Sequence, residues 1–121
     1  MILIDTSVWI DHLHQPDEGV VELLGRSEVV QHPLVIGELA LGSLRDRDLI
    51  LELMQNLAST PIATHEEVLH FVDRERLYGR GLSLVDAHLL ASVILAPGTV
   101  LWTRDRRLLA TAQQLGIAYR E

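Results

Sequence analysis

The sequence contains no cysteine, and its ten basic residues are all arginine, so it contains no lysine either. The absence of cysteine excludes disulfides, thiolate zinc sites and cysteine nucleophiles, and it fits a reducing compartment. The absence of lysine excludes the phosphate-binding lysine of a P-loop and a Schiff-base lysine. Enzymes that use a cysteine nucleophile or a catalytic lysine of these kinds are therefore ruled out.

Long apolar runs and an export signal are also missing. The longest apolar stretch, LLASVILAP, is shorter than the roughly 18 residues that a membrane helix needs. The chain does not begin with a basic segment followed by an apolar one, so we expect no secretory signal. These absences predict a cytoplasmic protein without a membrane segment.

The chain carries a formal net charge of −7, from 17 acidic and 10 basic residues. Proteins that coat nucleic acids usually present a basic face, so the charge disfavours such a role. It remains compatible with an enzyme that meets phosphate groups through a bound metal ion. Hydrophobic residues make up 48% of the chain, which is enough to build a packed core. We expect residues 1–121 to form a single domain.

Short apolar segments alternate with helical patterns along the chain. The patterns predict strands over 2–4, 29–31 and 99–102, with short extended segments around Ile62 and over 117–119. They predict helices over 7–13, 16–24, 33–44, 47–58, 65–81, 83–96 and 106–115. Pro16 and Pro33 are expected to open helices, and Asp46 to cap one. This alternation predicts an α/β fold whose parallel sheet is covered on both faces.

Four acidic residues stand where the apolar patterns do not call for acids. Asp5 comes directly after the first strand, and Asp105 comes shortly after the strand over 99–102. Glu38 and Asp86 fall on the apolar faces of predicted helices, where a carboxylate is unfavourable unless it is paired or bound to metal. Ligands of open α/β sheets bind at the carboxyl ends of the strands, which is where Asp5 and Asp105 are expected.

Each acid also has a purely structural interpretation. Asp5 and Asp105 are good helix N-caps, and Ser83 with Asp86 forms a capping-box pattern. Glu38 could reach the rim of its helix or pair with an arginine. If these interpretations hold, the chain is a non-catalytic binding module. Capping explains Glu38 least well.

Taken together, the four acids predict a metal site if the fold brings them to one edge of the sheet. Clustered carboxylates repel one another and raise each other's pKa, and a divalent cation removes that repulsion. Ligands that are all oxygen suit Mg²⁺ or Mn²⁺ rather than zinc. Such a site can activate water and stabilise the charge that develops during phosphodiester cleavage.

The segments around the four acids resemble those of PIN-domain ribonucleases, specifically the VapC toxins of bacterial type II toxin–antitoxin systems. The segments are IDTSVWIDHL, VIGELALG, LSLVDAHLLA and LWTRDRRLL, in fitting order and spacing over nearly the whole chain. The resemblance implies a three-layer α/β/α sandwich with a central parallel sheet. It also implies a metal-dependent endoribonuclease in which activated water leaves 5′-phosphate and 3′-hydroxyl ends.

The resemblance assigns site residues by position. It implies an acidic quartet that is catalytic and binds Mg²⁺ or Mn²⁺, formed by Asp5, Glu38, Asp86 and Asp105. Within this quartet, Asp5 and Asp86 are expected to be the direct metal ligands. Thr6 and Thr103 are expected to orient a carboxylate or a water molecule, and Ser7 either assists them or caps the first helix.

The resemblance also implies partners. An RNA substrate, a cognate VapB-type antitoxin and a second copy in a homodimer are expected, with DNA contacted only through the antitoxin. Arginines 104, 106 and 107 adjoin the fourth acid and could steer RNA phosphates toward the site. Arginines 74, 76 and 80 are instead expected on a solvated helix face.

Two other enzyme classes were compared with this interpretation. A PIN-domain nuclease of RNA processing that has no antitoxin fits the same motifs. An aspartyl-nucleophile phosphatase or a receiver domain also places an aspartate after a parallel strand, but both normally use a lysine, which this chain lacks. The phosphatases in addition need an acid where Ser7 stands.

Overall fold

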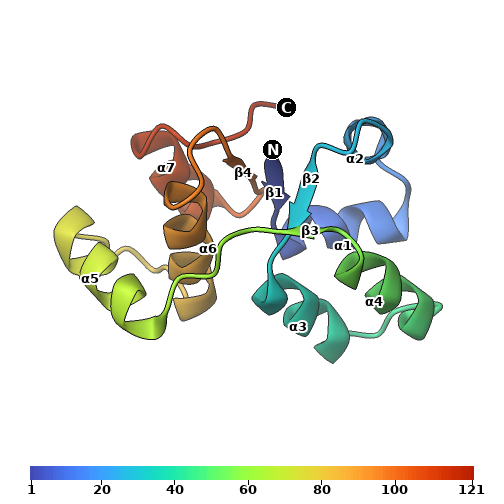
Figure 1. Ribbon diagram of the computed structural model, residues 1–121, viewed down its shortest axis with the longest axis horizontal. Helices are drawn as coiled ribbons and strands as arrows, with labels where there is room; N and C mark the ends of the chain where they lie inside the picture. Colours follow the sequence, from blue (N-terminus) through green and yellow to red (C-terminus); the bar gives the residue numbers. More distant parts are fainter.

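The computed structural model describes all 121 residues as a four-stranded parallel sheet surrounded by seven helices (Figure 1). The strands are β1 (Ile2–Ile4), β2 (Val29–Gln31), β3 (Ala58–Ser59) and β4 (Val100–Trp102). The helices are α1 (Thr6–His14), α2 (Glu18–Gly25), α3 (Pro33–Leu41), α4 (Arg47–Gln55), α5 (His65–Glu75), α6 (Leu84–Ile94) and α7 (Arg106–Gln114). The strand order is β3-β2-β1-β4, and every pair is parallel.

The helices form two layers on opposite sides of the sheet. Figure 1 shows α1 to α4 on one side and α5 to α7 on the other. Right-handed crossovers explain this division, because the chain steps from β1 through β2 to β3 in one direction. It then returns across the sheet to β4, on the far side of β1, and its later helices cover the opposite face. The predicted α/β/α architecture with a central parallel sheet is confirmed.

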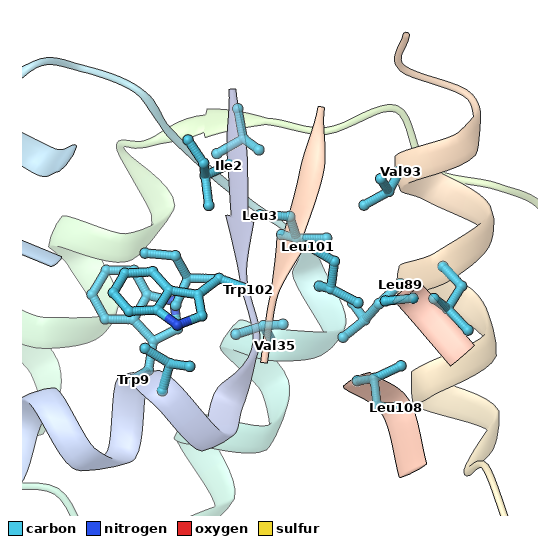
Figure 2. Close-up of a cluster of buried hydrophobic side chains, with 14 of the residues drawn as sticks. Ile2, Leu3, Trp9, Val35, Leu89, Val93, Leu101, Trp102 and Leu108 are labelled. Atoms are coloured by element: carbon cyan, nitrogen blue, oxygen red, sulfur yellow. The ribbon is translucent and has the colours of Figure 1, made fainter. Parts of the chain in front are cut away.

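Side chains alternate across the central strands, so β1 and β4 supply both sides of the core. Figure 2 shows Trp9 and Trp102 together on one side, and Leu89, Val93 and Leu108 on the other. All three residues of β1 are buried, as are Leu101 and Trp102 of β4. Burial on both faces explains why these strands are continuous apolar runs in the sequence.

Two extended segments differ from the prediction. The strand expected around Ile62 lies earlier, at Ala58–Ser59, and Ile62 itself is 57% exposed. Pairing with β2 determines where this strand lies. The backbone hydrogen bonding to β2 continues as far as Thr60, whose N–H donates to the carbonyl of Gln31. The segment over 117–119 forms only a single parallel bridge, between Ala118 and Leu101, rather than a full strand.

Local capping moves several helix boundaries. α2 begins at Glu18 rather than at Pro16, because the Asp17 carboxylate accepts the N–H groups of Gly19 and Val20. α5 stops at Glu75, earlier than predicted, because Arg76 adopts a left-handed conformation with φ of 55°. Asp46 precedes α4 as predicted, but its side chain makes no capping hydrogen bond.

The longest helices, α5 and α6, have 11 residues each. No helix in the fold has both the length and the apolar character that crossing a bilayer requires.

Candidate active site

The site lies at the carboxyl ends of β1 and β4, where the strand order reverses. β1 is followed by helices on one face of the sheet, and β4 is followed by α7 on the other (Figure 1). Loops that leave neighbouring strands toward opposite faces open a crevice between them, which is the usual ligand position in such sheets. Asp5 follows β1 directly, and Thr103 and Asp105 follow β4.

Asp5 is the buried centre of the site. Asp5 is only 5% exposed to solvent. Oδ2 accepts hydrogen bonds from Ser7 Oγ at 2.7 Å and from Thr103 Oγ1 at 2.8 Å. Oδ2 also lies 3.4 Å from the Ser7 amide nitrogen, so Asp5 is the N-cap of α1 as well. Oδ1 accepts no hydrogen bond from the protein, so one oxygen of this buried carboxylate stays free for a ligand.

Asp86 and Asp105 combine helix capping with the same one-sided hydrogen bonding. Asp86 Oδ2 accepts the Ser83 N–H at 3.0 Å and completes the predicted capping box of α6. Asp105 Oδ1 accepts the N–H groups of Arg107 and Leu108, each at 3.0 Å, and caps α7. The capping interpretation is therefore correct for both residues, and each still keeps a second oxygen that no protein group binds.

The charges of Asp5 and Asp105 act on Asp86. Burial raises the pKa of Asp86 above its ordinary value, and the negative charges of Asp5 and Asp105 raise it further. Hydrogen bonds from Ser83 act in the opposite direction without cancelling the increase. A cation bound beside Asp86 would offset the repulsion that destabilises its charged form.

Glu38 reaches the same region by a different route from the one predicted. The expected apolar stripe with Leu41 is wrong, because Leu41 is 91% exposed and Glu38 is exposed as well. Val35 and Leu39 form the buried face of α3 instead. Glu38 is joined to the site through Thr6, whose Oγ1 donates to Glu38 Oε1 at 2.7 Å. Because Thr6 is adjacent to Asp5, this bond ties α3 to the end of β1.

The four acids share a property that fits a hydrated divalent cation. Each is held through one oxygen and leaves the other without a protein partner. No three acidic or histidine side chains come close enough together to hold an ion by themselves. Mg²⁺ is commonly bound by only one or two carboxylates while it keeps several water molecules. The donors are all oxygen, and an ion held by at most two of them would have to retain water.

The arginines near the site divide into two kinds. The Arg104 guanidinium is already occupied by ion pairs with carboxylates of other segments, so it is not free to steer RNA as expected. Arg106 and Arg107 are exposed and form no ion pair. The first predicted cluster behaves as expected at Arg74, which pairs with its neighbour Glu75 on the surface of α5.

The sequence contained no local signal for the contacts of Arg104. Its partners Asp11 and Asp17 are 93 and 87 residues away in the chain. Only the pairing of β4 with β1 brings Arg104 close to these two aspartates. Asp17 could have been recognised as a helix cap by its residue type and position, but not as an ion-pair partner.

His32 is a buried residue next to the site, at the end of β2. It is 1% exposed, and its Nδ1 accepts the Leu34 N–H at 3.0 Å, which caps α3. The buried Nε2 has no hydrogen-bond partner. Burial lowers the pKa of His32 to about 4, with a smaller contribution from the charge of His88. His32 is therefore neutral in the folded protein at neutral pH.

We expect His32 to make the fold sensitive to acid. The unfolded chain binds a proton at the ordinary histidine pKa near 6.5, whereas the folded chain binds it only near 4. Stability that is present above pH 6.5 is therefore lost as the pH falls toward 4. The test variant is His32→Asn, because asparagine retains an oxygen that can cap α3. The free energy of unfolding in urea should be lower at about pH 4.5 than at neutral pH in the unaltered chain, and in His32→Asn this difference should be smaller by about 2–3 kcal/mol.

The matched control is His70→Asn, because His70 is exposed on α5. Its pH dependence of stability should equal that of the unaltered protein. An unchanged pH dependence in His32→Asn would contradict the assignment of a neutral buried imidazole.

The chain is similar to known proteins over its whole length. Residues 2–114 match the family described as PIN domain. The chain is 57% identical over 121 residues to Ribonuclease VapC32 of Mycobacterium tuberculosis, in strains CDC 1551 / Oshkosh and ATCC 25618 / H37Rv. That match covers 100% of this chain and 98% of each relative. Sequence, sheet topology and similarity agree, and the chain belongs to the PIN-domain family, in its VapC branch.

Proposed function

We propose that this chain is a divalent-metal-dependent endoribonuclease and the toxin of a type II toxin–antitoxin pair, formed by one nuclease domain over residues 1–121. One observation carries the proposal: Asp5, Glu38, Asp86 and Asp105 are each held by the protein through one carboxylate oxygen and leave the other oxygen without a protein partner. The full-length likeness to a protein named Ribonuclease VapC32 supports RNA as the substrate.

Asp5 and Asp86 are the proposed direct ligands of Mg²⁺ or Mn²⁺. Glu38 and Asp105 would bind the ion directly or through water. When bound, such an ion polarises a phosphate oxygen and lowers the pKa of water. The residues of the chain provide preorganisation, because hydrogen bonds to one oxygen of each acid restrict its rotation.

Thr103 and Thr6 have matching supporting roles in this proposal. Thr103 Oγ1 donates to Asp5 at 2.8 Å, and Thr6 Oγ1 donates to Glu38 at 2.7 Å. Each hydroxyl thereby fixes one carboxylate in the orientation that leaves its second oxygen available. Ser7 assists by donating to the same oxygen of Asp5 as Thr103 does.

The proposed reaction is hydrolysis of an internal phosphodiester bond by water. The ribose 2′-hydroxyl is not the nucleophile, so the products are a 5′-phosphate and a 3′-hydroxyl. Arg106 and Arg107, which are exposed next to Asp105 in the chain, are proposed to neutralise phosphates of the bound RNA.

The proposed partners follow from the VapC likeness. They are the RNA substrate, a VapB-type antitoxin and a second copy of the chain, in the cytoplasm, with DNA contacted only through the antitoxin. Exposed leucines on α3 and α4 support a partner surface, since Leu41 is 91%, Leu49 53% and Leu53 54% exposed.

The test of the proposed function is cleavage of total RNA by the purified chain with Mg²⁺ or Mn²⁺, and with EDTA. We expect discrete cuts that require the metal, stop with EDTA and return when excess Mn²⁺ is added. Enzymatic labelling should find phosphate at the 5′ ends of the products. Cutting that persists in EDTA, or 2′,3′-cyclic phosphate ends, would contradict the proposal.

A further inference from the structure

Arg104 binds three carboxylates from three separate parts of the chain. Its Nη1 donates to Asp11 Oδ2 of α1 at 2.8 Å, and its Nη2 donates to Asp17 Oδ2, at the N-cap of α2, at 2.7 Å. Its Nε donates to Glu121 Oε1 at 3.1 Å. The Trp102 ring lies beneath the guanidinium, with a distance of 5.5 Å from Cζ to the ring centroid. The N–H groups of the guanidinium and one of its flat faces are thus already in contact with groups of the protein itself.

The backbone of Arg104 is joined to the centre of the site. Its N–H donates to Ser7 Oγ at 3.1 Å, and Ser7 Oγ in turn donates to Asp5 Oδ2. On one side of Arg104, Thr103 donates to the same oxygen of Asp5. On the other side, the Asp105 N–H donates to Thr103 Oγ1 at 3.1 Å. Two of the four acids therefore depend on the position of this one turn.

The charges around Arg104 disfavour a role in binding RNA phosphate. The hydrogen bonds that Arg104 donates to Glu121, Asp17 and Asp11 raise its pKa above the ordinary value. The bond from Arg104 lowers the pKa of Asp17. One positive charge faces three negative ones, so an approaching phosphate meets a net negative group and must displace a carboxylate. Arg106 and Arg107 carry no such partners.

We propose that Arg104 is a positioning residue that clamps the turn 103–105 against Asp5 through Asp11, Asp17 and Glu121, and that it is not an RNA ligand. The proposal rests on the proposed function, since it concerns the acids assigned there to the metal. In this proposal the ion-pair network holds β4 and the turn after it against α1 and α2. The turn carries Thr103 and Asp105, which must be positioned next to Asp5.

The first experiment compares Arg104→Met with Arg26→Met. Both substitutions remove an arginine ion pair, but Arg26 pairs with Glu22 on the exposed surface of α2. Kinetics use an RNA oligonucleotide that the unaltered chain cuts with Mn²⁺. We expect Arg104→Met to lower kcat by about 10–100-fold with KM changed by less than about twofold. Arg26→Met should leave both constants unchanged.

Two further readouts do not depend on activity. Calorimetric titration should show Mn²⁺ affinity reduced by about 10–100-fold in Arg104→Met, and hydrogen–deuterium exchange should be faster over residues 103–108. A raised KM with unchanged kcat and a weaker salt dependence would overturn the proposal, because that pattern identifies an RNA ligand. If the unaltered chain cuts no RNA, the proposed function fails. Unchanged Mn²⁺ affinity and exchange in Arg104→Met would then overturn the positioning role separately.

A second variant, Asp17→Asn, guards against simple misfolding of Arg104→Met. Asparagine caps a helix as well as aspartate does, so α2 keeps its N-cap while Arg104 loses a charged partner. A positioning role predicts a lower kcat, and no additional loss when Asp17→Asn is combined with Arg104→Met. An RNA ligand predicts the opposite result, since freeing Arg104 would tighten RNA binding and leave kcat unchanged.

Discussion

Asp5→Asn is expected to abolish RNA cleavage while the chain remains folded. Asparagine has nearly the same volume and can still accept the hydrogen bonds from Ser7 and Thr103. It cannot supply the negative charge that a divalent cation requires. We expect kcat/KM for an RNA that the unaltered chain cuts to fall by at least about a thousandfold, which corresponds to roughly 4 kcal/mol of transition-state stabilisation.

The metal-free stability of Asp5→Asn should be equal to or higher than that of the unaltered chain. Removing the charge of Asp5 removes one of the causes that raise the pKa of Asp86. Thermal unfolding in EDTA measures this directly. The control is Asp73→Asn, because Asp73 is exposed on α5 and forms no ion pair. Equal cleavage by Asp5→Asn and the unaltered chain would show that the nuclease activity does not come from this site.

Leu3→Ala is expected to be strongly destabilising. Leu3 is completely buried in β1, which pairs with strands on both sides. Removing its side chain should cost about 3–5 kcal/mol, a large share of the roughly 5–15 kcal/mol that stabilises a typical domain. Thermal unfolding should show a Tm lower by about 10–20 °C, at roughly 4 °C per kcal/mol for a chain of this size.

Leu41→Ala is the matched control for Leu3→Ala. Leu41 is 91% exposed at the end of α3, so the same truncation should change the free energy of unfolding by less than about 0.5 kcal/mol. A loss below about 1 kcal/mol at Leu3 would contradict the packing of the central strand. A large loss at Leu41, by contrast, would indicate that a second copy covers α3 in solution.

The strands that were predicted correctly are those whose residues are buried on both faces. β1, β2 and β4 are short apolar runs, and burial on both sides of a parallel sheet selects that composition. β3 could not be found in this way, because Ala58 and Ser59 are both exposed at the sheet edge. Only pairing with β2 defines it, and pairing partners leave no local trace in the sequence.

The candidate site was predictable to a different extent at each acid. Asp5 and Asp105 were selected because acids directly or shortly after apolar runs mark the carboxyl ends of strands, and that position is where the fold puts them. Glu38 was selected for a burial that it does not have, since it is exposed and held by Thr6. The ion pairs of Arg104 were not predicted, because long-range ion pairs between separate segments have no periodicity that a sequence reveals.

The capping of three helices by site acids has a consequence for how the protein responds to loss of metal. Asp5, Asp86 and Asp105 each sit in the first turn of a helix, where aligned peptide dipoles place partial positive charge. The carboxylates thus have internal compensation even when no ion is present, unlike the ligands of a zinc finger, whose fold collapses without metal. A chelator should therefore remove the RNA-cleaving activity while the protein remains folded. Returning the ion should restore activity within the time of ion binding, with no refolding step.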